Sequence, residues 1–177
     1  MNNRLAILGI CAAGSNAGKT TLITQLIPEL AKRNIRVSVI KHAHHQFDID
    51  HPGKDSFTIR EAGAVQTLIA SGKRWALMTE MMRTPNYSDE ANLDELLDQI
   101  NPDYADLILV EGFKQAAIPK IEVYRPSVHQ LLLAREDKNI IAVATDEPLE
   151  LSIPTLDLNN ISAIADFIIV KVLTANS

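Results

Sequence analysis

The hydrophobic positions at the start of the chain follow three successive patterns. A continuous apolar run spans residues 5–11, and residues 19–33 then place apolar side chains every three or four positions. A second short apolar run follows at residues 36–41. These patterns predict a strand, a helix that Pro28 kinks, and a second strand, and such a unit closes as a parallel crossover.

The pattern in the rest of the chain predicts shorter elements beyond a polar segment. Residues 42–55 are rich in His, Asp, Pro and Gly, which predicts a loop. Two apolar strips, residues 65–70 and 75–79, flank a turn-forming Ser-Gly-Lys sequence and predict a hairpin. The remaining expected elements are helices at residues 57–62, 93–100 and 162–173, and strands at residues 107–110, 121–123, 131–133, 140–144 and 153–156.

The length and composition fit one globular α/β domain spanning residues 1–177. The chain has 46% apolar and 22% charged residues and a net charge of −5, which argues against a surface that coats nucleic acid. No run of about 18 apolar residues could cross a bilayer, so we expect no membrane partner. Cys11 is the single cysteine, so no intrachain disulfide can form, and we expect a cytoplasmic protein.

A phosphate-binding motif lies between the first predicted strand and the first predicted helix. The segment Ala13-Gly-Ser-Asn-Ala-Gly-Lys-Thr20 matches G-x-x-x-x-G-K-[ST] except at its first position. Small residues let successive backbone N–H groups turn inward around an anion, and the helix dipole points at the same place. The expected phosphate-binding residues are Gly14, Ser15, Asn16, Ala17, Gly18, Lys19, Thr20 and Thr21.

The alternative to a phosphate site is a glycine-rich turn in which Lys19 is only solvated. That alternative explains the glycines, but it leaves a lysine in the first turn of a helix, where its charge opposes the helix dipole. A bound anion removes this conflict. Ala13 requires only that the loop begin without a positive φ at that position.

An acidic residue at the end of a buried strand supports the same assignment. Residues 107–110 are all apolar and lead to Glu111 and Gly112. The carboxyl ends of parallel strands form the edge where open α/β sheets bind ligands. We therefore expect Thr20 and Glu111 to hold Mg²⁺, the alternative being that Glu111 is an ordinary surface charge. Asp106, at the other end of the strand, is expected to be a solvated boundary residue.

A histidine cluster follows the second predicted strand, with four of the five histidines inside residues 42–51. One explanation is a metal site, although no cysteine ligand lies nearby. A second is that this segment projects towards the phosphates or towards a partner molecule that carries a phosphate. The candidate residues for that contact are Lys41, His42, His44, His45 and Asp48. A solvated loop without function is the third explanation.

Recognition of the base is less defined than binding of the phosphates. No Asn-Lys-x-Asp motif appears, so the usual guanine signature of GTPases is missing. Thr145-Asp146-Glu147-Pro148 follows the predicted strand at residues 140–144, where such a loop would lie in chain order. Asp146 could accept hydrogen bonds from the ring N–H and the amino group of guanine, a pair that adenine does not offer. The alternative is an ordinary turn before Pro148.

Seven sequence blocks, the phosphate loop and six that follow it, form an ordered series along the chain. They are residues 13–21, Ile40-Lys-His-Ala-His-His45, Pro52-Gly-Lys-Asp-Ser56, Arg60-Glu-Ala-Gly-Ala64, Arg74-Trp-Ala-Leu-Met-Thr-Glu80, Leu109-Val-Glu-Gly-Phe-Lys114 and Ala142-Val-Ala-Thr-Asp146. This ordered series resembles the family of molybdopterin-guanine dinucleotide biosynthesis protein B. It is far more specific than a phosphate loop alone.

The resemblance implies a P-loop NTPase-like fold, in which helices flank a mostly parallel sheet and a hairpin or loop region is inserted in the middle of the chain. It also implies a homodimer that binds GTP and Mg²⁺. Such a protein would assist the molybdopterin guanylyltransferase MobA, which joins GMP to molybdopterin in molybdenum cofactor biosynthesis; molybdopterin or its product would be a further partner. Hydrolysis of GTP is expected to be slow at most, because no arginine finger or water-orienting glutamine can be identified.

Two other functions remain open. A small P-loop kinase, or a ligase like dethiobiotin synthetase, would share the phosphate loop and the strand-end Glu111-Gly112. A kinase would be expected to carry an arginine-rich lid, whereas Arg125 and Arg135 are scattered. A metal chaperone would use the histidine cluster as its store, and equilibrium dialysis that finds no tight Zn²⁺ or Ni²⁺ site would exclude it.

Overall fold

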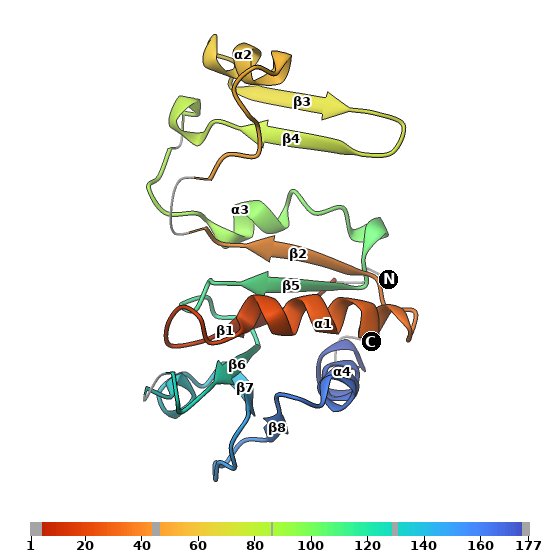
Figure 1. Cartoon of the computed structure of the whole chain (residues 1–177), viewed down its shortest axis with the longest axis vertical. Coiled ribbons are helices and arrows are strands. Elements are labelled where there is room, and N and C mark those ends of the chain that lie inside the picture. Colours follow the sequence, from red (N-terminus) through yellow and green to blue (C-terminus); the bar gives the residue numbers. More distant parts are fainter. Residues whose placement is uncertain (1–4, 44–46, 86, 129–130, 175–177) are drawn as a thin grey trace. The chain divides into compact units, whose positions relative to one another are not determined.

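A computed structural model describes residues 5–43, 47–85, 87–128 and 131–174. The chain forms two compact units, which we call the sheet unit and the hairpin unit (Figure 1). The sheet unit contains the chain up to His42 and again from Leu93, and the hairpin unit is Ala43–Asn92. The expectation of one domain over residues 1–177 stays a prediction.

Six parallel strands make up the sheet of the first unit, in the order β2-β5-β1-β6-β7-β8 (Figure 1). Their bounds are β1 Ala6–Cys11, β2 Val37–Lys41, β5 Leu107–Glu111, β6 Lys120–Tyr124, β7 Ile140–Thr145 and β8 Thr155–Asp157. Because β5 lies between β1 and β2, its carboxyl end is next to the ends of both strands. The predicted α/β class with a mostly parallel sheet is confirmed.

Helices cover both faces of this sheet, because its central strands are apolar on both sides. Helices α1 (Lys19–Ala31) and α4 (Ile161–Ile168), which continues as a π-helical turn Ile169–Leu173, pack in one core with Leu107 and Leu109 of β5. On the other face, Ile108 and Val110 pack with Leu93 of α3 (Leu93–Leu97). Alternation of side chains along a strand explains why β5 is apolar throughout.

The hairpin unit has little core of its own. It contains α2 (Asp55–Glu61), the antiparallel strands β3 (Gln66–Ala70) and β4 (Trp75–Thr79), and a 3₁₀ turn at Met81–Arg83. Ser71 donates its backbone N–H to the carbonyl of Arg74 at 2.8 Å and closes the loop between the strands. The predicted hairpin is therefore confirmed. Within the described part of this unit, no apolar side chain is buried.

One expected strand is wrong. Residues 131–133 do not join the sheet, and a 3₁₀ turn occupies Leu133–Arg135. The carboxylate of Glu122 accepts the backbone N–H groups of Leu133 and Ala134 at 2.9 and 2.8 Å, so a side chain takes the place of a strand partner. A second 3₁₀ turn lies at Pro102–Tyr104. Among the described residues, no helix is long and apolar enough to cross a membrane.

Candidate functional site

The phosphate loop runs from the end of β1 to Lys19, the first residue of α1. Asn16 and Gly18 turn the backbone with φ angles of 63° and 100°. Ala13 does not have a positive φ, so the loop begins without needing a glycine there. Helix α1 has no capping side chain and no acidic residue in its first turn. Its first N–H groups and its dipole therefore favour an anion at this end.

The side chain of Lys19 folds over the loop that precedes it. Its Nζ donates a hydrogen bond to the carbonyl oxygen of Gly14 at 2.9 Å. The ammonium thus lies beside the same turn of backbone that the motif predicts to surround phosphate. A lysine in the first turn of a helix meets the positive end of the dipole, and an anion bound in the loop would offset that repulsion.

Three elements bring polar groups together next to the loop. The hydroxyl of Thr20 in α1 donates to Oε1 of Glu111 at 2.8 Å, although Glu111 is the last residue of β5. Lys41, the last residue of β2, places Nζ 3.1 Å from the Thr20 hydroxyl and 3.3 Å from Oε2 of Glu111. Lys41 and Glu111 are register partners on adjacent parallel strands, so their side chains lie on the same face.

The oxygen atoms of this cluster suit Mg²⁺. Hydroxyl and carboxylate oxygens are ligands that Mg²⁺ prefers, and the Glu111 side chain is only 9% exposed. The ammonium of Lys41 already lies beside both oxygens, which shows that the position attracts a cation. In the described ranges, no group of three or more His, Cys, Asp or Glu could hold a metal. Water and phosphate oxygens would therefore complete the coordination of Mg²⁺.

His42 follows Lys41 and is held at the end of β5. Its backbone N–H donates to the carbonyl of Glu111 at 2.8 Å, and its ring stacks on Phe113 with centroids 4.8 Å apart. The chain leaves room for this approach only because residue 112 is glycine. Gly112 has a φ of 103°, and a Cβ atom there would lie 2.8 Å from the Cβ of His42.

The other candidate contact residues of this segment are His44, His45 and Asp48. His44 and His45 lie outside the described residues. Asp48 belongs to the hairpin unit, where Arg60 donates to its carboxylate at 2.9 Å. That hydrogen bond lowers the pKa of Asp48 below its ordinary value. The role of these residues in ligand contact stays a prediction.

Asp146 directly follows β7 and is bound by Arg125, one of the two arginines scattered through the second half of the sequence. Nη1 of Arg125 donates to Oδ2 of Asp146 at 2.7 Å, and Nε of the same guanidinium donates to the carbonyl of Ala17 at 3.2 Å. Arg125 thereby joins the candidate base-recognition residue to the phosphate loop. Its position immediately after β6, at the carboxyl edge of the sheet, is the signal that could have identified it.

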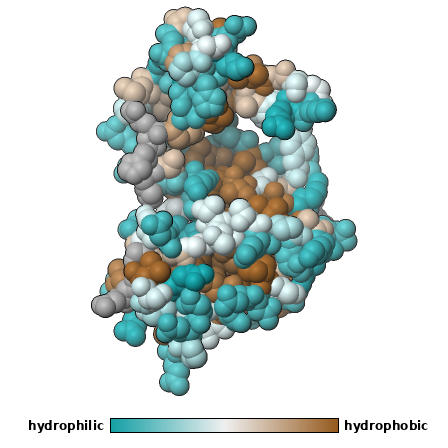
Figure 2. Space-filling view, in the orientation of Figure 1, coloured by the Kyte–Doolittle hydropathy of each residue, from teal (hydrophilic) through white to brown (hydrophobic). Residues whose placement is uncertain are grey.

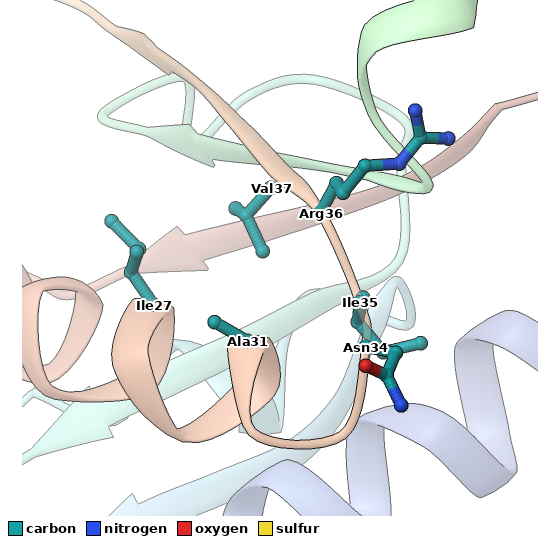
Figure 3. A pocket seen from close by; sticks show the side chains of 6 residues that line it. All are labelled: Ile27, Ala31, Asn34, Ile35, Arg36 and Val37. Carbon is teal, nitrogen blue, oxygen red and sulfur yellow. The ribbon is translucent and has the colours of Figure 1, made fainter.

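Two hollows border α1. One, of about 180 Å³, is lined by Gly18, Thr21, Leu22, Gln25, Arg125, Leu158, Asn159 and Ile161. The other, of about 410 Å³, is lined at the far end of the helix by Ile27, Ala31, Asn34, Ile35, Arg36 and Val37 (Figure 3). The larger hollow contains none of the predicted site residues. The smaller one includes phosphate-loop residues, so we place the candidate nucleotide site beside it.

Comparisons with known proteins show which family this chain resembles. Residues 7–146 match the family model of molybdopterin guanine dinucleotide synthesis protein B, MobB. The molybdopterin-guanine dinucleotide biosynthesis adapter protein of Haemophilus influenzae is 49% identical over 168 residues, which are 95% of this chain and 90% of the relative. The adapter protein of Escherichia coli K12 is 48% identical over 159 residues, which are 89% of each chain.

A solved structure supports the fold independently. The crystal structure of Bacillus subtilis MobB superimposes with a TM-score of 0.71 at 20% sequence identity, covering 95% of this chain and 98% of the other. At that identity the likeness bears on the fold alone. The match therefore agrees with the parallel sheet and flanking helices described above.

Proposed function

The chain belongs to the family of molybdopterin guanine dinucleotide synthesis protein B, and from this premise we propose that it is an accessory protein of molybdenum cofactor biosynthesis that binds GTP with Mg²⁺. Residues 14–21 hold the phosphates, and Thr20 and Glu111 bind the metal ion. Any hydrolysis of GTP is slow, and the protein acts in the cytoplasm. Its output is assistance to another protein and not a reaction of its own.

The observation that carries the nucleotide proposal is the contact between Thr20 and Glu111. The hydroxyl and the carboxylate lie 91 positions apart in the sequence and meet at 2.8 Å beside the N-terminus of α1. A glycine-rich turn that binds no ligand would need no carboxylate at this position. A Lys19 that is only solvated would not need one either. A site for a metal ion bound to phosphate needs both.

Support for a role in guanine dinucleotide formation comes from the relatives. The similar proteins of Haemophilus influenzae and Escherichia coli are both named molybdopterin-guanine dinucleotide biosynthesis adapter proteins. An adapter in this process would act with the guanylyltransferase MobA and with molybdopterin or its product. Lys41 and His42 lie at the carboxyl edge of the sheet, beside the proposed phosphate site, where a second phosphate-bearing molecule could be contacted.

Self-association is part of the proposal, with a homodimer as the functional form. The hairpin unit exposes large apolar side chains, including Leu68 at 62%, Trp75 at 60% and Met82 at 78%. A two-stranded hairpin is marginally stable by itself. Figure 2 also shows apolar side chains at the surface of the sheet unit over β2 and α3. Apolar surface of this kind marks sites of protein association.

Reconstitution of guanine dinucleotide formation tests the proposed function. Purified guanylyltransferase, molybdopterin and GTP are combined with and without this protein, and the yield of product is measured. We expect the protein to increase the yield. His44→Ala and His45→Ala should reduce that increase while leaving GTP affinity unchanged. No increase with the unmodified protein would contradict the accessory role, and full stimulation by both variants would show that these histidines are not needed.

A further inference from the structure

Arg125 is the one residue whose side chain we find bonded both to the described phosphate loop and to the loop after β7. Its Nε donates to the carbonyl of Ala17 and its Nη1 to Oδ2 of Asp146, at 3.2 and 2.7 Å. The guanidinium is planar and permanently charged, so two bonds from one side chain fix the distance between the two loops. Its packing is close, since a Cβ on Gly18 would lie 3.6 Å from the Arg125 Nε.

The two oxygens of Asp146 have different surroundings. Oδ2 accepts from Arg125, whereas Oδ1 is buried and has no hydrogen-bond partner among the described residues. A buried acceptor without a donor is costly, so such an atom marks a place where a donor is missing. Because each carboxylate oxygen has two lone pairs, the bond to Arg125 still leaves acceptor positions on both oxygens.

A hollow with room for part of a ligand lies beside this pair. Arg125 lines the space of about 180 Å³ together with Gly18 and Thr21 of the phosphate loop and with Asn159. A nucleotide whose phosphates occupy the loop extends its sugar and base away from the helix N-terminus. Arg125 is one of the residues that line this hollow. It also forms an ion pair with Asp146, the residue whose other carboxylate oxygen has no partner among the described residues.

We propose that Arg125 is a positioning residue for base recognition, which holds the Asp146 carboxylate at a fixed distance from the phosphate loop so that it accepts the ring N–H and amino group of a guanine. The inference rests on the proposed GTP-binding function and assigns the origin of its base preference. Arg125 does not contact the base itself. Adenine lacks this pair of donors, so its nucleotide gains nothing from the orientation of Asp146.

Titration of the full-length protein with non-hydrolysable GTP and ATP analogues in Mg²⁺ tests the role of Arg125. The variants are Arg125→Gln, Arg125→Lys and, as a matched control, Arg135→Gln, which makes the same chemical change at an exposed arginine. We expect Arg125→Gln to weaken GTP-analogue binding about tenfold or more while ATP-analogue binding changes much less. Arg125→Lys keeps the charge without the two-point geometry and should restore the preference only in part.

The outcomes separate this inference from the function on which it rests. If the unmodified protein prefers GTP and both Arg125→Gln and Arg125→Lys keep that preference, the proposed role of Arg125 is wrong. The GTP-binding proposal would still stand. Equal binding of both analogues by the unmodified protein would contradict the GTP proposal itself. If Arg125→Gln unfolds, Arg125→Lys decides. A double variant with Asp146→Asn should lose little more preference than either single variant, because both changes remove the same interaction.

Discussion

The hydroxyl of Thr20 donates a 2.8 Å hydrogen bond to the carboxylate of Glu111, which lies 91 positions later in the chain. The contact exists because β5 pairs with β1 in parallel and delivers its last residue to the edge at which the phosphate loop begins. Lys41 reaches the same two oxygens from β2, the other neighbour of β5. A short piece of sheet edge thus gathers a hydroxyl, a carboxylate and an ammonium around one point.

Replacing Lys19 by alanine should abolish tight nucleotide binding and leave the fold intact. In the described structure the Lys19 ammonium bonds to the carbonyl of Gly14 and contributes nothing to the core. Its loss should therefore affect the proposed phosphate contact and not the folding of the chain. Calorimetry measures nucleotide binding and thermal unfolding measures stability. Lys32→Ala, at a side chain 72% exposed near the other end of α1, is the matched control and should bind normally. Global unfolding of Lys19→Ala would contradict this description of the loop.

Asp146→Asn should reduce the preference for GTP over ATP by about tenfold or more, because a carboxylate that accepts from two N–H donors becomes an amide that can accept on one side only. The amide can donate to the carbonyl group that xanthine has in place of the amino group of guanine. We therefore also expect improved binding of xanthosine triphosphate. Competition titrations with the three nucleotides measure both effects, and unchanged affinities would move base recognition to another residue.

Gly112→Ala should destabilise the protein by about 1–3 kcal/mol, since alanine is strained at a φ of 103° and its Cβ would lie 2.8 Å from that of His42. The free energy of unfolding in urea measures the loss. Gly72→Ala is the matched control: a Cβ added there meets nothing within 4 Å, and its φ is not positive. Equal stability of the two variants would show that His42 does not pack against Gly112 in solution.

The pair formed by Arg36 and Asp106 should make stability depend on pH in the acidic range. Its guanidinium bonds to the Asp106 carboxylate at 2.8 Å and lowers the pKa of Asp106 below the ordinary value of 3.8. The stabilisation is therefore complete above the pKa of the unfolded chain and is lost as pH falls through the folded one. The difference in urea midpoint between the unmodified protein and Asp106→Asn should hold at pH values well above 3.8 and shrink as the pH falls below 3.8. A constant difference would show that the pair contributes no pH dependence.

The sequence placed the loop between β1 and α1 correctly, because everything that defines this loop is local, and its binding of phosphate stays a prediction. The small residues, Lys19 and Thr20 lie within eight positions, and the preceding strand and following helix are visible from their hydrophobic periods. The position of Glu111 at the ligand-binding edge of the sheet could also be predicted directly, since a strand of a parallel sheet has its carboxyl end at that edge. Asp106 was expected to be a solvated boundary residue; its side chain is 36% exposed, and it also bonds to Arg36, which precedes the neighbouring strand β2.

What could not be predicted depends on the order of the strands. Arg125 reaches Ala17 and Asp146 only because β6 lies between β1 and β7 in the sheet, and a single sequence does not reveal that order. The pattern of β6 was misleading as well. The expected strand at residues 121–123 did not include Lys120, which is only 1% exposed and forms an ion pair with Asp137 at 2.7 Å.

Calorimetric titration with non-hydrolysable GTP and ATP analogues, with and without Mg²⁺, tests the central claim most directly. It compares the unmodified protein with Glu111→Gln and with the control Asp106→Asn at the opposite end of β5. We predict that the unmodified protein and the control bind the GTP analogue more tightly than the ATP analogue and more tightly with Mg²⁺, while Glu111→Gln loses most of the Mg²⁺ effect. Equal or ATP-favoured binding, or a Mg²⁺ effect that survives in Glu111→Gln, would contradict the account and favour a kinase-like or ligase-like protein or a different metal site.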